Sequence, residues 1–170
     1  MMKITKRTKY KIKATLLFTL FILFLYGIKY LVVKLDKSPI APASYTTKYK
    51  VRYRYIFDGD TAAFFDEEGN EISCRFIGVN APEIGEEGYQ EAKMFSDSTL
   101  RNALEIILEL EPHSTTYDKY GRTLAWVWVD GKLLQGKLLE NNLVQLKYLE
   151  PNYLYANYLN KINNEKNVTE

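Results

Sequence analysis

Residues 58–65 read Asp-Gly-Asp-Thr-Ala-Ala-Phe-Phe, so two carboxylates flank a glycine just before an apolar run. An Asp-Gly pair is a strong turn signal, and the first interpretation is a turn between two strands. The second is that Asp60, fixed at the start of a strand, also holds a hard cation through its carboxylate. On these residues alone the turn is favoured, and the rest of the chain must decide about the cation.

Two arginines and a glutamate occur further along in positions suited to phosphate chemistry. Arg75 interrupts an apolar strand-like segment that leads to Asn80 and Glu83, and Arg122 ends a polar loop. Guanidinium groups match phosphate oxygens and stabilise charge that develops on them, and a glutamate can take a proton from water. Together with Asp60, these residues form the set that phosphodiester hydrolysis requires. The alternative is that both arginines pair with surface acids.

Charge is distributed unevenly along the 170 residues, a length that fits one domain and an appendage. Residues 1–50 hold 11 Lys and Arg against one Asp, whereas residues 51–170 hold 12 Lys and Arg against 20 Asp and Glu. A domain this acidic can bind a polyanion only through a local basic patch. The single cysteine, Cys74, excludes an internal disulfide and a cysteine-built zinc site, and we expect it in a buried strand. The single histidine, His113, is expected in a solvated loop.

Residues 1–33 are typical of a membrane-targeting segment. Six basic residues precede the uncharged residues 14–28, and the apolar stretch continues past Lys29 to Val33. Twenty apolar residues can cross a hydrocarbon core of about 30 Å, and the basic flank favours a cytoplasmic N-terminus. We expect an uncleaved anchor in the cell membrane that holds the domain outside the cell. The alternative is a signal peptide cleaved after Ala43, which releases a secreted domain beginning near Ser44.

The remaining chain predicts a tether at residues 34–50 and one folded domain at residues 51–170. Short apolar segments predict five strands, at residues 51–57, 61–65, 71–79, 106–110 and 124–129. Helical spacing predicts three helices, at residues 89–104, 133–139 and 153–162. A short extended piece is expected at residues 143–149, after Asn142 as a left-handed helix cap. This pattern predicts an α+β fold, a small β-barrel with helices on its flank.

Taken in order, these segments resemble the staphylococcal-type nuclease (thermonuclease-like) family over residues 53–151. The resemblance rests on Asp-Gly-Asp-Thr at residues 58–61, Arg75, Pro-Glu at residues 82–83 and Asp-Lys-Tyr-Gly-Arg at residues 118–122. It implies a five-stranded OB-fold barrel with three helices. It also implies a calcium-dependent nuclease that hydrolyses DNA, RNA or both.

The resemblance further implies a role for each matched residue. Arg75 and Arg122 correspond to the phosphate-binding arginines, and Glu83 corresponds to the residue that activates water. The other implied site residues are the calcium ligands Asp60, Asn80 and Ala81, the near-metal residues Asp58 and Thr61, and the nucleotide-pocket residues Lys119, Tyr120 and Tyr148.

Two departures from the family pattern concern the metal. Asn80 stands where the best-known members have a second calcium-binding aspartate, so one negative charge is missing. Ala81 replaces a threonine that ligates through its backbone carbonyl, which is a tolerable exchange. We therefore expect an exported, monomeric calcium-dependent nuclease. The alternative is a catalytically weak or inactive OB-type module that binds nucleic acid at the cell surface.

Overall fold

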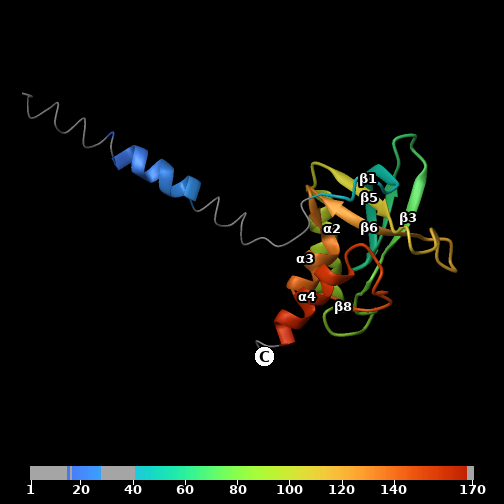
Figure 1. Cartoon of the computed structure of the whole chain (residues 1–170). Helices are drawn as coiled ribbons and strands as arrows, with labels where there is room; N and C mark the ends of the chain where they lie inside the picture. The colour runs from blue at the N-terminus through green and yellow to red at the C-terminus, as the bar shows by residue number, and fades with distance from the viewer. Residues whose placement is uncertain (1–14, 16, 28–40, 168–170) are drawn as a thin grey trace, which may run out of the picture. The chain divides into compact units, whose positions relative to one another are not determined.

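The computed structural model describes Thr15 and residues 17–27 and 41–167, in two units that divide after Lys37 (Figure 1). In the first unit Thr15 and residues 17–27 are helical. None of the helices in the described ranges is both long enough and apolar enough to cross a membrane. The predicted span at residues 14–33 lies partly outside these ranges, as do residues 34–40 of the predicted tether.

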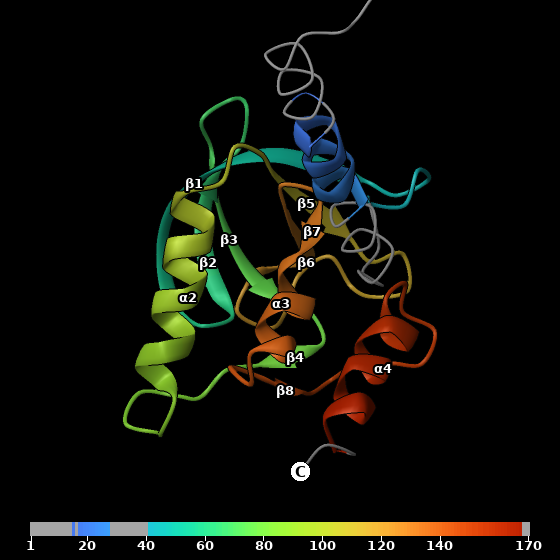
Figure 2. The same ribbon diagram turned by 90° about the vertical axis from the view of Figure 1, so that its left-hand side faces the viewer.

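The second unit contains a closed barrel of five strands, as predicted (Figures 1 and 2). The strands are β1 (Lys48–Asp58), β2 (Thr61–Phe65), β3 (Glu71–Phe76), β5 (Ile106–Leu110) and β6 (Thr123–Val129). β1 pairs antiparallel with both β2 and β5, β2 with β3, and β5 with β6. The parallel pair β3–β6 closes the barrel, which is the strand arrangement of an OB fold.

The barrel core is built from alternating inward residues of these strands. Phe64, Phe76, Leu108, Trp126 and Trp128 are all essentially inaccessible to solvent. Six of the seven β6 residues, including both tryptophans, are buried or nearly so, because the barrel interior covers one face and helices cover the other. Each large aromatic side chain buries about 150–250 Å², so these residues contribute substantially to the apolar area of the core.

Three helices flank the barrel, as predicted: α2 (Tyr89–Arg101), α3 (Leu134–Glu140) and α4 (Ala156–Asn167). α2 ends three residues earlier than expected, and α4 begins and ends later. Asn142, just after α3, has a φ of 59°, which confirms the predicted left-handed cap.

α2 packs directly against the Asp-Gly-Asp turn. A Cβ atom on Gly59 would lie 2.7 Å from the Cβ atom of Ala92 and 2.8 Å from that of Ala81. The hydroxyl of Ser96 donates a hydrogen bond of 2.6 Å to the Gly59 carbonyl oxygen. Gly59 is therefore required less for backbone freedom than for the close approach of a helix that holds the turn in place.

The predicted third strand, at residues 71–79, is broken in two. β3 ends at Phe76, the chain turns at Gly78 with a φ of 79°, and β4 (Val79–Asn80) then pairs with β8 (Gln145–Leu146). The continuous apolar run hid this turn, because Ile77 and Val79 are both buried although they lie on either side of it. The extended piece at residues 143–149 supplies β8, and a short strand that the sequence did not predict, β7 (Lys132–Leu133), extends the sheet beside β6.

The chain joins the barrel earlier than predicted. β1 starts at Lys48 rather than at residue 51, and its first four residues pair with β5. Just before it, the backbone N–H of Ala43 and the hydroxyl of Thr46 both donate to the buried carboxylate of Glu109. Residues 43–50, expected to be part of the tether, are therefore held against the barrel.

Candidate active site

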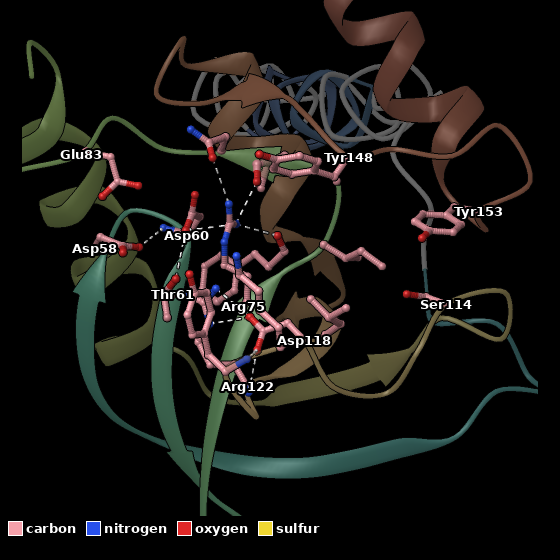
Figure 3. A pocket seen from close by; sticks show the side chains of 18 residues that line it. Asp58, Asp60, Thr61, Arg75, Glu83, Ser114, Asp118, Arg122, Tyr148 and Tyr153 are labelled. Carbon is pink, nitrogen blue, oxygen red and sulfur yellow. Dashed lines mark hydrogen bonds and ion pairs between the residues drawn. The ribbon is translucent and has the colours of Figure 1, made fainter.

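The residues singled out in the sequence converge on one cleft of about 570 Å³ (Figure 3). Strand ends and two loops from distant parts of the chain build it. The predicted site residues that line it are Asp58, Asp60, Thr61, Arg75, Asn80, Glu83, Lys119, Tyr120, Arg122 and Tyr148. Ala81 does not line this cleft, but its backbone contacts the side chains of residues that do.

Asp58 shapes the turn, and Asp60 points its carboxylate into a buried polar network. The Asp60 N–H donates to the Asp58 carboxylate at 3.0 Å, which is the side-chain-to-backbone bond of an Asx turn. The Asp60 side chain lies 3.0 Å from both the Thr61 hydroxyl and the Arg75 guanidinium, and its other oxygen accepts from the Ala81 N–H. The turn interpretation is therefore confirmed for Asp58, and the cation interpretation stays a prediction for Asp60.

The ionised form of the Asp60 carboxylate is poorly stabilised by its surroundings. Burial raises the pKa of Asp60 to about 7; Arg75 acts against this rise, and the neighbouring carboxylate of Asp58 adds to it. Asp60 is only 4% exposed, so water screens little of this repulsion. A further cation beside Asp60 would stabilise its ionised form.

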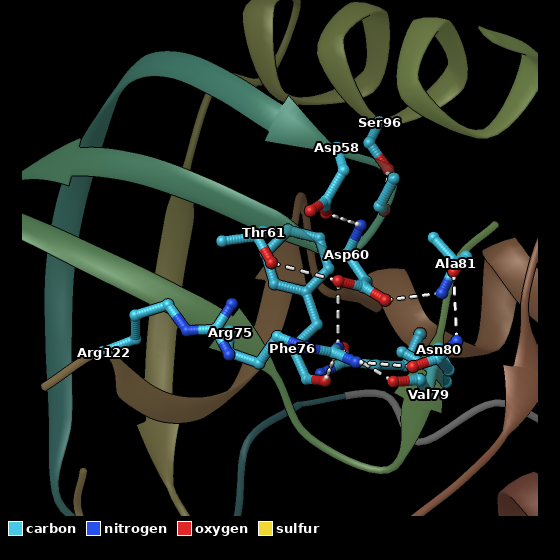
Figure 4. A network of polar contacts seen from close by, with 12 residues as sticks. Asp58, Asp60, Thr61, Arg75, Phe76, Val79, Asn80, Ala81, Ser96 and Arg122 are labelled. Carbon is cyan, nitrogen blue, oxygen red and sulfur yellow. Dashed lines mark hydrogen bonds and ion pairs between the residues drawn. The ribbon is translucent and has the colours of Figure 1, made fainter. Parts of the chain in front are cut away.

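Arg75 is fixed by the turn that follows β3 (Figure 4). One nitrogen of its guanidinium donates to the carbonyl oxygens of Phe76 at 3.0 Å and Val79 at 2.8 Å. Another nitrogen donates to the carboxamide oxygen of Asn80 at 3.2 Å. These carbonyl groups point toward the arginine because the chain turns at Gly78. The sequence did not predict this turn. Arg75 is thus preorganised at the wall of the cleft with a 14% exposed side chain.

The oxygen donors around Asp60 suit a hard cation. They are the Asp60 carboxylate, the Asn80 carboxamide and the Ala81 carbonyl, which accepts from the Asn80 amide at 3.1 Å. Within the described ranges no group of three or more His, Cys, Asp and Glu side chains could hold a metal ion. A metal site here must therefore use amide and backbone oxygens, which calcium accepts readily.

Arg122 is held by Asp118 in the loop before β6. The Asp118 carboxylate accepts from the backbone N–H groups of Tyr120 and Arg122, and from the Arg122 guanidinium at 2.7 Å. Burial would raise the pKa of Asp118, but these hydrogen bonds outweigh it and hold the pKa below its usual value. The Arg122 guanidinium also lies 5.4 Å from the centre of the Tyr120 ring. Arginine and aromatic ring thus lie together at one edge of the cleft.

Glu83 and Tyr148 lie on exposed segments at the mouth of the cleft (Figure 3). Glu83 belongs to the loop before α2, and its N–H donates to the Glu86 carboxylate. Tyr148 is 72% exposed and has a left-handed φ of 56°, which is unusual for a residue other than glycine. The N–H of the preceding Lys147 donates to the Gly78 carbonyl oxygen, so the Tyr148 backbone is tied to the same turn that holds Arg75.

Sequence reasoning left unassigned three lining residues with polar side chains: Ser114, Asp118 and Tyr153. Asp118 could have been found, because it precedes Arg122 by four residues with a glycine between them, a spacing that allows an ion pair across a tight loop. Nothing in the pattern around Ser114 or Tyr153 indicates the cleft, since both reach it only through the tertiary fold.

Comparisons with known proteins point to one family. The family model described as staphylococcal nuclease homologue matches residues 73–167, more than half of the chain. A thermonuclease of Staphylococcus hyicus is 32% identical over 99 residues, which cover 55% of this chain and 58% of the relative. A thermonuclease of Staphylococcus intermedius is 33% identical over 81 residues, which cover 46% of this chain and 48% of the relative.

The matches thus span about half the length of these relatives. The part of this chain that the family model matches begins at Ser73. It contains Arg75, Glu83 and Arg122 but not the Asp-Gly-Asp turn. The turn is linked to them by the Asp60–Arg75 ion pair and the shared cleft. With more than half of its residues matched by the family model, the chain belongs to the staphylococcal nuclease homologue family.

Proposed function

We propose that the protein is a calcium-dependent nuclease that hydrolyses phosphodiester bonds in DNA, RNA or both. One observation carries the proposal: Asp60, Arg75, Glu83 and Arg122, which come from four separate segments, line a single cleft. Arginines that merely paired with surface acids would not be brought together beside a free glutamate. The thermonucleases that the chain resembles support the same activity.

In this proposal Arg75 and Arg122 bind the oxygens of the reacting phosphate and stabilise the charge that develops there. Glu83 accepts a proton from water while the water oxygen forms its bond to phosphorus. The bond to the leaving oxygen then breaks, that oxygen takes up a proton from solvent water, and Glu83 releases its proton to solvent. Glu83 is exposed in its loop, where water can reach its carboxylate, whereas both arginines are fixed by hydrogen bonds.

Asp60, Asn80 and Ala81 would hold the calcium ion, with Asp58 and Thr61 beside it. The fit rests on these oxygen donors, and since burial raises the pKa of Asp60 to about 7, a bound cation would stabilise its ionised form. When bound, the ion would supply positive charge next to the reacting phosphate. The chain's own residues orient the substrate and move the proton.

We also propose that the nuclease domain works outside the cell, either anchored or secreted. The basic residues before the uncharged residues 14–28 support export. The contact of the Ala43 N–H with Glu109 favours the anchored form over cleavage after Ala43, because that cleavage would remove a residue bound to the barrel. The domain is proposed to act as a monomer.

The test is digestion of labelled DNA and RNA by the purified full chain, with calcium and with chelator. Glu83→Gln is compared with wild type, since this variant keeps the size of the side chain and removes its basicity. Cleavage that requires both calcium and Glu83 supports the proposal. Cleavage unaffected by Glu83→Gln would remove Glu83 from its role.

A second function, nucleic-acid binding without turnover, is favoured by one specific observation. Arg75 and Arg122 are each paired with an aspartate, and Asn80 lacks the charge that the family pattern has at this position. Binding of uncleaved DNA or RNA in calcium, with no product formed, would establish this alternative.

A further inference from the structure

A second groove, of about 290 Å³, lies between β1 and the C-terminal end of α2. It shares no lining residue with the reaction cleft. Three arginines line it, Arg52 and Arg54 from β1 and Arg101 from the last turn of α2. Tyr53 and the 96% exposed Leu104 also line it.

The arginines of the domain are divided between these two sites. Residues 51–170 contain five arginines in all, against 20 acidic residues. Two of the five line the reaction cleft, and the other three line this groove. An acidic domain that binds a polyanion must do so through local basic patches, and the arginines supply two.

The three arginines of the groove lie beside aromatic rings, of which Tyr53 lines the groove and Phe65 does not. Arg52 and Arg54 lie 5.9 Å and 5.1 Å from the centre of the Phe65 ring, and Arg101 lies 5.6 Å from the centre of the Tyr53 ring. Proteins that bind single-stranded nucleic acid use this combination, because cations follow the phosphates while rings and guanidinium planes stack on bases.

The arginines are available to a ligand. Arg54 pairs with Glu71, and Arg101 pairs with Asp97, but both ion pairs are largely exposed, and exposed pairs hold their partners weakly. Arg52 is exposed, and in the described part of the chain no acidic side chain pairs with it. Phosphate oxygens can replace the carboxylates with the same bidentate geometry.

β1 connects the groove to the reaction cleft. The strand passes Arg52 and Arg54 and ends at Asp58, which lines the cleft. The four residue steps from Arg54 to Asp58 span about 13 Å. This distance corresponds to about four nucleotides of a stacked strand at 3.4 Å each.

We propose that this groove is a second binding site for the substrate strand, which contacts phosphates and bases about four nucleotides from the bond that is cut. The proposal rests on the proposed function for the identity of the ligand. The arginines would raise the affinity for long substrates and leave the chemistry in the cleft unchanged. Their structural role, which is to cover Phe65 and Tyr53, would instead affect stability alone.

The test is the binding of fluorescent single-stranded DNA of about 12 and about three nucleotides, lengths on either side of the smallest sites of OB folds. Chelator is present, so that nothing is cut. Arg52→Gln should weaken binding of the longer strand about three- to tenfold, and the slope of log affinity against log salt should fall by about 0.7. Binding of the shorter strand should not change. Lys161→Gln removes one exposed charge from α4 and should bind both strands like wild type.

Asp97→Asn gives the opposite change, because it releases Arg101 from its ion pair. It should tighten binding of the longer strand and not of the shorter one. Wild-type affinity of Arg52→Gln for the longer strand would overturn the proposal, as would an equal loss for both lengths.

The two proposals fail in different ways. If the protein binds the longer strand through Arg52 but does not cleave it, the second binding site stands and the proposed nuclease activity fails. If the protein cleaves both lengths, and neither cleavage nor binding of the longer strand depends on Arg52, the nuclease activity stands and the second binding site fails.

Discussion

The Arg75 guanidinium lies 3.0 Å from the Asp60 carboxylate, and their side chains are only 14% and 6% exposed. The residue expected to bind phosphate and the residue expected to bind calcium are therefore paired with each other across the cleft wall. Removing one member of a buried ion pair leaves the other uncompensated, which is usually costly. The second arginine, Arg122, makes a similar pair with Asp118, but its side chain is 29% exposed.

Replacing either arginine by alanine should therefore slow catalysis to a similar extent, but the two replacements should differ in their effect on stability. Arg75→Ala and Arg122→Ala should each slow cleavage at least about a hundredfold, as the loss of a preorganised charge-stabilising donor does. Arg75→Ala should also lower the free energy of unfolding by about 2–3 kcal/mol, because Asp60 stays buried. Arg122→Ala should cost less than about 1 kcal/mol. Cleavage rates and urea unfolding followed by circular dichroism measure both effects, and a wild-type rate in either variant would remove that arginine from the mechanism.

Asn80→Asp should lower the calcium concentration for half-maximal activity. Calcium affinity follows the charge of the ligands, and this exchange restores one negative charge beside Asp60. The wild-type site should be weak, in the range of about 10⁻⁴–10⁻³ M typical of extracellular modules. Turnover at saturating calcium should change less, because the arginines and Glu83 are untouched.

Activity titrated against free calcium compares wild type with Asn80→Asp, and Asp60→Ala is the control that should abolish calcium-dependent activity. An unchanged midpoint in Asn80→Asp would mean that position 80 does not face the metal.

The barrel could be predicted from the sequence because its strands are short, apolar and bounded by turn residues. β2 and β5 have the predicted bounds, and α2 begins at the predicted residue. The break at Gly78 was missed because both sides of the turn are buried, so the apolar pattern continues through it. The pairing of β4 with β8 depends on contacts between residues far apart in the chain, which no local pattern reveals.

The residues that line the candidate site could be predicted from the sequence, but the hydrogen bonds that hold them in place could not. Residue types and order placed Asp60, Arg75 and Arg122 in one cleft. The hydrogen bonds that fix Arg75 go to the carbonyl oxygens of Phe76 and Val79, and any residue could supply a carbonyl group there. The second arginine groove was missed because its members come from β1 and α2 and meet only in the folded chain.

The loop that holds Arg122 should lose stability in acid. The folded-state pKa of Asp118 lies below its usual value, so the carboxylate contributes stability above the unfolded pKa of about 3.8. That contribution is lost as the pH falls through the depressed pKa, because protonation breaks the hydrogen bonds to Arg122. Asp118→Asn should be less stable than wild type at neutral pH, and the difference should shrink below about pH 3.8. Unfolding free energies from pH 7 to pH 2.5 test this, and a difference independent of pH would contradict it.

The last prediction concerns Glu109, a fully buried carboxylate that joins the start of the domain to its end. It accepts hydrogen bonds from the Trp128 indole and the Tyr155 hydroxyl at 2.8 Å each, as well as from Ala43 and Thr46. Glutamine at this position would turn an NH₂ group toward some of these donors and leave them unsatisfied. Glu109→Gln should therefore lower the free energy of unfolding by about 2–4 kcal/mol.

Glu111→Gln is the matched control, since Glu111 is also buried and accepts from the Trp126 indole and the Leu154 N–H, whereas the hydrogen bonds from Ala43 and Thr46 go to Glu109. Both variants should be destabilised. Under native conditions, however, only Glu109→Gln should speed hydrogen exchange at the Ala43 amide, because only that variant frees the segment before β1 while the barrel stays folded. Equal exchange at Ala43 in the two variants would show that the segment is held by the barrel as a whole rather than by Glu109.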